Sequence, residues 1–290
     1  MLNRIEIVGF KSIREMNLEL RPINVMIGAN GAGKSNLVSF FKLLNYLTSG
    51  SLQRYIGESG GAESLLYFGA KTTSQLSAYL HFDTPTGKNA YFLRLVSAAQ
   101  DTLIFADEAV SFSRYGKPDA GLYSLGAGHK ETLLKDISNG LQKTNQINIK
   151  TVTTIKGIMD RWRVYHFHDT SAQANIKKLA YVNDNSYLRA DAGNLAAFLY
   201  FLRQNRNEYY QRIVATIRLA IPFFDEFILI PSPHNGNYII LNWRETGSPP
   251  DTVFGPHQLS DGTLRLMALV TLLLQPESIL LRENNQFLSG

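Results

Sequence analysis

The first 50 residues change from a strand-like to a helix-like hydrophobic pattern. Apolar and polar residues alternate over 2–8 and 16–20, and an apolar run covers Ile23–Ile27, so three short strands are predicted. From Asn36 to Leu47, apolar residues recur every three or four positions, which predicts an amphipathic helix packed on a sheet. A strand followed directly by a helix is therefore expected across residues 23–47.

Further along the chain, the pattern first alternates with period two and later becomes helical. Alternation between residues 76 and 115 predicts an antiparallel meander with short turns, whereas 48–61 is Gly/Ser-rich and predicts a loop. A short strand is predicted at Val164–Phe167. The predicted helices are 131–137, 152–162, 191–203, 208–220 and 263–274, and a hairpin is predicted over 227–243.

Composition fits an ordinary globular protein, and the length is enough for one large α/β domain. The chain has 290 residues, 44% of them hydrophobic, and a net charge of +5, which permits nucleic-acid contact without demanding it. The absence of cysteine excludes disulfides and thiolate zinc sites and fits a reducing compartment. The apolar run Leu266–Leu274 is too short to cross a bilayer, and the N-terminus lacks the apolar core of a signal peptide. A cytoplasmic location without membrane contact is expected.

The most specific chemical signal is G-x-x-x-x-G-K-S at residues 28–35, between the predicted strand and helix. The glycines let backbone N–H groups point at phosphate oxygens, and the helix N-terminus adds positive partial charge. Lys34 would reach the β- and γ-phosphates, and Ser35 would ligate Mg²⁺. Asn36, directly after Ser35, is a further candidate, although it also fits as an ordinary helix residue that does not contact the ligand. The candidate binding residues are Gly28, Asn30, Gly31, Ala32, Gly33, Lys34, Ser35 and Asn36.

A second candidate motif, Leu259–Arg265, stands at the head of the last predicted helix. Ser260 suits an N-cap position, and Gly262 would let a ligand approach the backbone. Two interpretations are open: a routine turn with a helix cap, or a clamp for the phosphates held by the first motif.

Three segments of the chain resemble ABC-like P-loop ATPases of the SMC/RecF type, and most of all predicted AAA ATPases related to OLD (overcoming-lysogenisation-defect) proteins. They are Ile5–Leu47 with Gly9-Phe10-Lys11-Ser12, Val164–Ala197, and Leu259–Leu274. The resemblance implies one α/β P-loop NTPase head over residues 1–290, with a β-rich lobe and a helical insertion. Its parts are the start of the P-loop lobe (1–50), the meander (51–130), the helical insertion (131–222) and the signature-helix part (223–290).

The same resemblance implies that ATP and Mg²⁺ are sandwiched between two copies of the chain. The P-loop of one copy and the signature residues Ser260 and Gly262 of the other would bind one triphosphate. Two interpretations of Lys11 are open: it approaches the nucleotide from the strand side, or it is a solvated loop lysine. The expected partners are a second copy of the chain and DNA or a nuclease or other effector. The implied role is DNA maintenance or anti-phage defence.

The acidic motif that these ATPases carry after the signature helix is not matched. Arg282 stands where an aspartate is expected, and Glu283 stands where the general base is expected. An arginine beside Mg²⁺ adds repulsion and cannot replace a carboxylate ligand. Glu283 is the candidate catalytic residue, and a chain truncated within this region is expected. Hydrolysis is expected to be impaired, with a non-hydrolysing nucleotide-binding module or truncated relic as the alternative.

Other candidates have weaker signals. The string that ends in Asp107-Glu108 resembles an acidic ATPase motif, but it precedes the signature, so an exposed strand end is preferred. His166, His168 and Asp169 could ligate a metal on a strand or line the lobe. A basic helical face for DNA contact, or a solvated helix surface, would comprise Arg203, Arg206, Arg212 and Arg218. The sequence lacks the Asn-Lys-x-Asp motif of guanine-specific GTPases.

Overall fold

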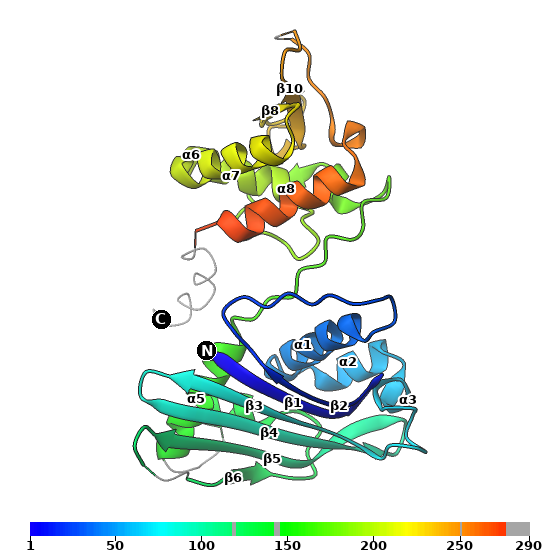
Figure 1. Ribbon diagram of the computed structural model, residues 1–290, viewed down its shortest axis with the longest axis vertical. Coiled ribbons are helices and arrows are strands. Elements are labelled where there is room, and N and C mark those ends of the chain that lie inside the picture. Colours follow the sequence, from blue (N-terminus) through cyan, green and yellow to red (C-terminus); the bar gives the residue numbers. More distant parts are fainter. Residues whose placement is uncertain (118–119, 142–145, 250, 277–290) are drawn as a thin grey trace. The chain divides into compact units, whose positions relative to one another are not determined.

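The computed structural model describes residues 1–117, 120–141, 146–249 and 251–276 (Figure 1). The chain divides into two compact units, Met1–Trp162 and Arg163–Gly290. The boundary between these units falls inside the segment 131–222, which the resemblance assigns to a helical insertion.

The first unit is built on a six-stranded antiparallel sheet with the order β2-β1-β3-β4-β5-β6 (Figure 1). Strands β3, β4 and β5 form the predicted meander, which is confirmed. The strands are β1 (Leu2–Phe10), β2 (Ile13–Glu19), β3 (Gln75–Thr84), β4 (Gly87–Ala98), β5 (Thr102–Arg114) and β6 (Tyr123–Gly126). The helices are α1 (Lys34–Thr48), α2 (Leu52–Glu58), α3 (Gly61–Leu65), α4 (Leu133–Ser138) and α5 (Gln146–Met159).

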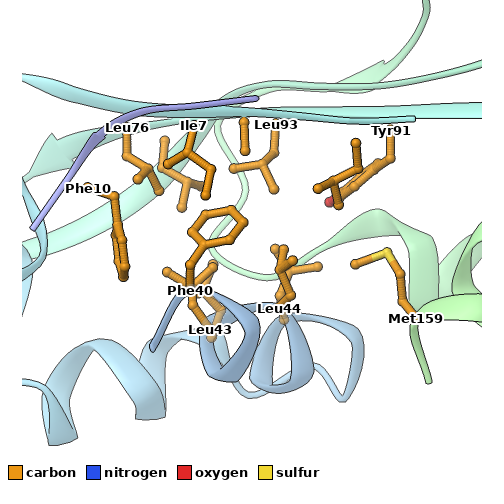
Figure 2. Packing of buried hydrophobic residues seen from close by; sticks show 14 of the residues in the cluster. Ile7, Phe10, Phe40, Leu43, Leu44, Leu76, Tyr91, Leu93 and Met159 are labelled. Carbon is orange, nitrogen blue, oxygen red and sulfur yellow. The ribbon is translucent and has the colours of Figure 1, made fainter. Parts of the chain in front are cut away.

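Helix α1 packs its apolar face on one face of this sheet, as its periodicity predicts (Figure 2). Phe40 and Leu44 are fully buried against side chains from the strands, and Met159 of α5 joins the same layer. The rings of Phe10 and Phe40 meet edge to face with their centroids 5.4 Å apart. Each such buried side chain contributes about 1.5–3 kcal/mol of hydrophobic stabilisation. This packing fixes the start of α1, and with it the loop that precedes it.

Two predictions for the N-terminal region are wrong. Part of the predicted loop 48–61 is α2, because Leu52, Tyr55 and Ile56 bury one helical face. Ile23–Ile27 does not form a strand in the described structure, and Ile27 is 92% exposed. Asn24 closes a local turn with the backbone of Arg21 instead. A strand needs a hydrogen-bonding neighbour, and the sheet of this unit is composed of other segments.

The second unit is mainly helical and has its own hydrophobic core. Helix α8 packs against α7, which also contacts α6 and β8. The helices are α6 (Leu195–Asn205), α7 (Asn207–Ala220) and α8 (Asp261–Leu274), with short 3-10 turns η1 (Asn175–Lys177) and η2 (Pro256–Gln258). Two small antiparallel pairs join β7 (Ala180–Tyr181) to β9 (Tyr238–Ile239) and β8 (Phe224–Ile228) to β10 (Asn242–Glu245).

Here too, local patterns predict the helices better than the strand partners. The predicted strand Val164–Phe167 is irregular chain, and the predicted hairpin 227–243 is split between the two pairs. The helix predicted from residue 191 begins at Leu195, because the buried Asn194 side chain binds backbone groups of the preceding loop. Strand pairing depends on which segments meet in space, and periodicity within one segment does not contain that information.

Candidate nucleotide-binding site

The loop before α1 curls around the side chain of Lys34. The ammonium Nζ of Lys34 donates hydrogen bonds to the carbonyl oxygens of Gly28, at 2.6 Å, and Ala29, at 2.7 Å. Lys34 is the first residue of α1, so the positive end of the helix and the ammonium lie at the same loop. The loop therefore carries a cation and a helix N-terminus, the two groups that attract phosphate.

Glycine is required at two positions of this loop. Gly31 has a φ of +85°, and Gly33, which precedes α1, has a φ of +89°. Residues with a Cβ atom rarely adopt this left-handed conformation. A Cβ atom on Gly33 would also lie 3.4 Å from the hydroxyl oxygen of Ser12. The glycines of the motif thus permit a backbone shape and a close approach that other residues would strain.

The turn between β1 and β2 lies against this loop. The side-chain amide of Asn36 donates to the hydroxyl of Ser12 over 2.5 Å. Lys11, which precedes Ser12 in the chain, has a φ of +48°, and its backbone N–H donates a hydrogen bond to the carbonyl oxygen of Leu65. Burial lowers the pKa of Lys11, and the charge of Lys42 lowers it further. Asn36 is therefore a helix residue that also connects the loop to the β1–β2 turn.

The predicted signature residues stand at the start of α8 in the second unit. Ser260 is the N-cap, and its hydroxyl accepts a hydrogen bond from the backbone N–H of Thr263 at 3.1 Å. The same hydroxyl lies 2.8 Å from the hydroxyl of Thr263. Ser260 and Gly262 are both exposed. Capping is thus confirmed as one role of Ser260, and its exposure leaves the second predicted role, a phosphate clamp, open.

Two cationic side chains that sequence reasoning missed fix the head of α8. Lys177 of η1 lies with its Nζ 3.5 Å from the carboxylate of Asp261, the first residue of α8. Arg265 donates to the carbonyl of His168 at 2.8 Å and to the hydroxyl of Thr170 at 3.2 Å. The segment around residues 166–178 and the signature helix therefore meet. No local sequence pattern marks either contact.

The acidic string Asp107-Glu108 lies in the middle of β5, so the prediction of an exposed strand end is wrong. The Glu108 carboxylate is completely buried and receives hydrogen bonds from its surroundings. The donors are Tyr91 at 2.7 Å, His129 and the Leu133 N–H at 2.9 Å, and Thr132. Burial raises the pKa of Tyr91 well above its usual value, and the neighbouring Glu108 raises it further. Asp107 pairs with Arg94 instead.

The remaining candidates have local structural roles. The rings of His166 and His168 meet edge to face at 4.5 Å, and hydrogen bonds from Ser171 hold the pKa of Asp169 below its usual value. Among the described residues, no group of three or more metal-ligating side chains is present. Of the proposed basic face, Arg218 pairs with Asp225 at 3.2 Å. Glu283, the candidate general base, lies outside the described residues.

A glycine loop that surrounds a lysine ammonium at the start of a helix, within an α/β fold, defines the P-loop class of nucleotide-binding proteins. A comparison with known sequence families gives the narrower assignment. The chain belongs to the family described as AAA domain, putative AbiEii toxin, type IV TA system, which matches residues 23–281. The predicted assignment to AAA-type P-loop ATPases with an α/β fold is confirmed.

Individual relatives are more distant. A solved structure described as the recombination mediator protein RecF-ATP in the RecFOR pathway is 13% identical, with a TM-score of 0.30. That match covers 96% of this chain and 82% of the other. Urease accessory protein 2 of Cryptococcus neoformans var. grubii is 35% identical over 32% of this chain, which corresponds to 8% of that protein's length.

Within the part of the chain that the structure describes, every helix is too short or too polar to cross a bilayer.

Proposed function

We propose that this chain is an ATP-binding head that binds Mg-ATP at its P-loop and associates with a second copy around the nucleotide. The observation that carries the proposal is the loop curled around the Lys34 ammonium, at 2.6 and 2.7 Å from two carbonyl oxygens. That ammonium can exchange carbonyl oxygens for phosphate oxygens without a change of fold. Membership of an AAA-domain family supports the choice of nucleotide.

The residues of the loop fit Mg-ATP. The left-handed glycines leave the backbone open to close approach, and the loop from Gly28 to Ala32 is exposed. Backbone N–H groups of residues 30–34 would hold the phosphates, and Lys34 would neutralise their charge. Ser35 is exposed at the first turn of α1, where a hydroxyl can serve as a Mg²⁺ ligand. When bound, Mg²⁺ supplies charge neutralisation between the phosphates.

The second half of the site would come from another copy of the chain. Ser260 and Gly262 are exposed at the start of α8, a helix long enough to present a full N-terminal turn. A hydroxyl, backbone N–H groups and the helix dipole can together hold a γ-phosphate. ATP would then join two heads, each of which contributes one P-loop and one signature helix.

Hydrolysis requires an acid that orients water, and the described acids of the Asp107-Glu108 string do not suit this role. Glu108 is buried with its oxygens engaged by four donors, and Asp107 is paired with Arg94. We therefore propose nucleotide binding and association as the core activity, with any turnover depending on Glu283. The wider role would be DNA maintenance or defence against phage, beside DNA or an effector protein.

Thermal unfolding with and without Mg-ATP tests the binding step. At a nucleotide concentration of about 100 Kd, the wild-type chain should gain about 5–10 °C in Tm. Lys34→Ala should lose this gain, whereas Lys71→Ala, which removes an exposed lysine of the same unit, should keep it. An equal Tm gain in the Lys34→Ala variant would overturn the assignment of the P-loop.

Sedimentation velocity with Mg-ATP tests the association step. Wild-type chain should form a nucleotide-dependent dimer, and Ser260→Arg should bind Mg-ATP but remain monomeric, because the longer cationic side chain blocks the clamp. Gln211→Arg, on an exposed position of α7, is the matched control and should dimerise. A wild-type chain that binds Mg-ATP and stays monomeric favours the alternative, a nucleotide-binding module without a dimer switch.

A further inference from the structure

The start of α8 carries an acid where phosphate is proposed to bind. Asp261 is the first residue of the helix, directly after Ser260, and its side chain is 60% exposed. A carboxylate at this position favours the helix because it complements the positive N-terminal end. The same carboxylate repels a phosphate that approaches Ser260. A signature helix that begins with an aspartate therefore needs a nearby positive charge before it can hold a triphosphate.

Lys177 supplies a positive charge at this position. Its Nζ lies 3.5 Å from a carboxylate oxygen of Asp261, and its side chain is only 9% exposed. The backbone carbonyl of Thr170, a buried residue, accepts a hydrogen bond from the same ammonium at 2.6 Å. The lysine is thus held from inside the unit, whereas its carboxylate partner faces solvent. The ammonium remains at the head of α8 whichever way the Asp261 side chain turns.

The surrounding contacts keep this lysine in place. Arg265, one turn further along α8, donates to the hydroxyl of Thr170, so Thr170 is held by α8 as well as by Lys177. The 3-10 turn that contains Lys177 also packs against η2, which ends two residues before Ser260. The adjacent Lys178 is exposed and donates to Asn175 at 3.3 Å instead. Of these two neighbouring lysines, only one therefore faces the signature helix.

We propose that Lys177 is a charge-compensating residue that lets the acidic start of α8 accept the γ-phosphate of ATP bound to a second copy of the chain. The proposal rests on the ATP-dependent association proposed above, and it assigns a role to a residue outside both nucleotide motifs. Lys177 acts through Asp261: it cancels the charge that would otherwise repel the nucleotide.

A set of four variants separates charge compensation from simple structural support. Lys177→Met keeps much of the aliphatic side chain and removes the charge, so Asp261 is left uncompensated. ATP-dependent dimerisation should weaken about tenfold or more, as for loss of one partly buried ion-pair partner. Asp261→Asn alone should tighten dimerisation, because a positive charge then remains near the phosphate. The double variant should dimerise within about threefold of wild type. Lys178→Met is the matched control and should behave as wild type.

The measurement is the dimer dissociation constant by sedimentation equilibrium in Mg-ATP, at low and at high salt, with Tm recorded for each variant. Dimerisation of Lys177→Met that equals wild type would overturn the proposal. Failure of Asp261→Asn to restore dimerisation in the double variant would do so as well, because it would leave Lys177 a structural residue only. If Lys177→Met does not fold, the test rests on Asp261→Asn, which changes an exposed side chain. A dimer dissociation constant and salt dependence equal to those of wild type would then overturn the proposal.

Failure of the underlying function gives a different result. If the wild-type chain stays monomeric in Mg-ATP, the proposed association is wrong, and so is the role of Lys177 that depends on it. A wild-type chain that dimerises, together with a Lys177→Met variant that dimerises equally well, removes only the role of Lys177.

Discussion

Asn36 and Ser12 join two segments that surround the candidate site: the amide of Asn36 donates to the Ser12 hydroxyl over 2.5 Å. Asn36 lies in the first turn of α1, and Ser12 lies in the turn between β1 and β2. The hydrogen bond therefore links the P-loop helix to the edge of the sheet. The helix whose first residue, Lys34, binds the loop is thereby tied to the β1–β2 turn.

This link predicts the effect of Ser12→Ala on nucleotide binding. Loss of one neutral hydrogen bond should weaken Mg-ATP binding about two- to tenfold, measured by isothermal titration calorimetry. Ser49→Ala removes a comparable hydrogen bond, from Ser49 to the Tyr46 carbonyl at 2.8 Å, at the other end of the same helix. The Ser49 variant should bind Mg-ATP like wild type. Equal affinities for all three proteins would show that the Ser12 contact does not support the loop.

Glu108→Gln tests whether the buried carboxylate serves stability or catalysis. A glutamine cannot accept all the hydrogen bonds that Glu108 receives, so the free energy of unfolding should fall by about 1–3 kcal/mol in urea denaturation. Asp107→Asn, which disrupts a half-exposed ion pair, should cost less than about 1 kcal/mol. Phosphate release from Mg-ATP should not change per folded molecule. A selective loss of turnover in Glu108→Gln would contradict this expectation and indicate that Glu108 takes part in catalysis.

Tyr91 should make the first unit sensitive to alkaline pH. Because its pKa is raised in the folded state, the unfolded chain loses this proton first, at a pH of about 10. The stabilisation is therefore complete below about pH 10 and is lost as the pH rises, with a slope of about 1.4 kcal/mol per pH unit. Tyr91→Phe should show a shallower decline between about pH 10 and 11 in urea titrations. Identical slopes for the two proteins would contradict this assignment.

Ile27 and Ile7 provide a matched pair for the segment that did not form a strand. Ile7 is fully buried in the sheet, and Ile27 is 92% exposed. Ile7→Ala should lower the free energy of unfolding by about 2–5 kcal/mol, and Ile27→Ala should change it by less than about 0.5 kcal/mol. Chemical denaturation measures both. A loss of several kcal/mol for Ile27→Ala would mean that this segment is packed in the protein in solution.

The sequence predicts those features that depend on local pattern. Helix α1 is predicted because Leu37, Phe40, Leu44 and Leu47 recur at helical spacing and all become buried. The meander is predicted because its strands are neighbours in sequence and pair through short turns. The P-loop is recognised because its glycines and lysine are consecutive and act on one another's backbone. In each case the interacting residues lie close together along the chain.

Features that depend on distant segments could not be predicted in the same way. Arg265 and His168 are 97 residues apart and still hydrogen-bonded. The hydrophobic string that ends in Glu108 is compatible with an exposed strand end and with a buried hydrogen-bond network. The residues that surround Glu108 in space decide between these two structures. Ile23–Ile27 has the composition of a strand, but composition does not provide the strand beside it. Three-dimensional context is what the local patterns lack.

The two hydrogen bonds from Lys34 have a consequence for how a ligand would enter. The curved shape of the loop depends on α1, because the first residue of that helix supplies the ammonium that binds the carbonyl oxygens of Gly28 and Ala29. Arrival of a phosphate then replaces existing partners of the ammonium and orders little new chain, which limits the entropic cost of binding. Lys34 thus shapes the phosphate-binding loop before the ligand arrives. The affinity of the loop for phosphate therefore depends on the first turn of α1, which positions this lysine.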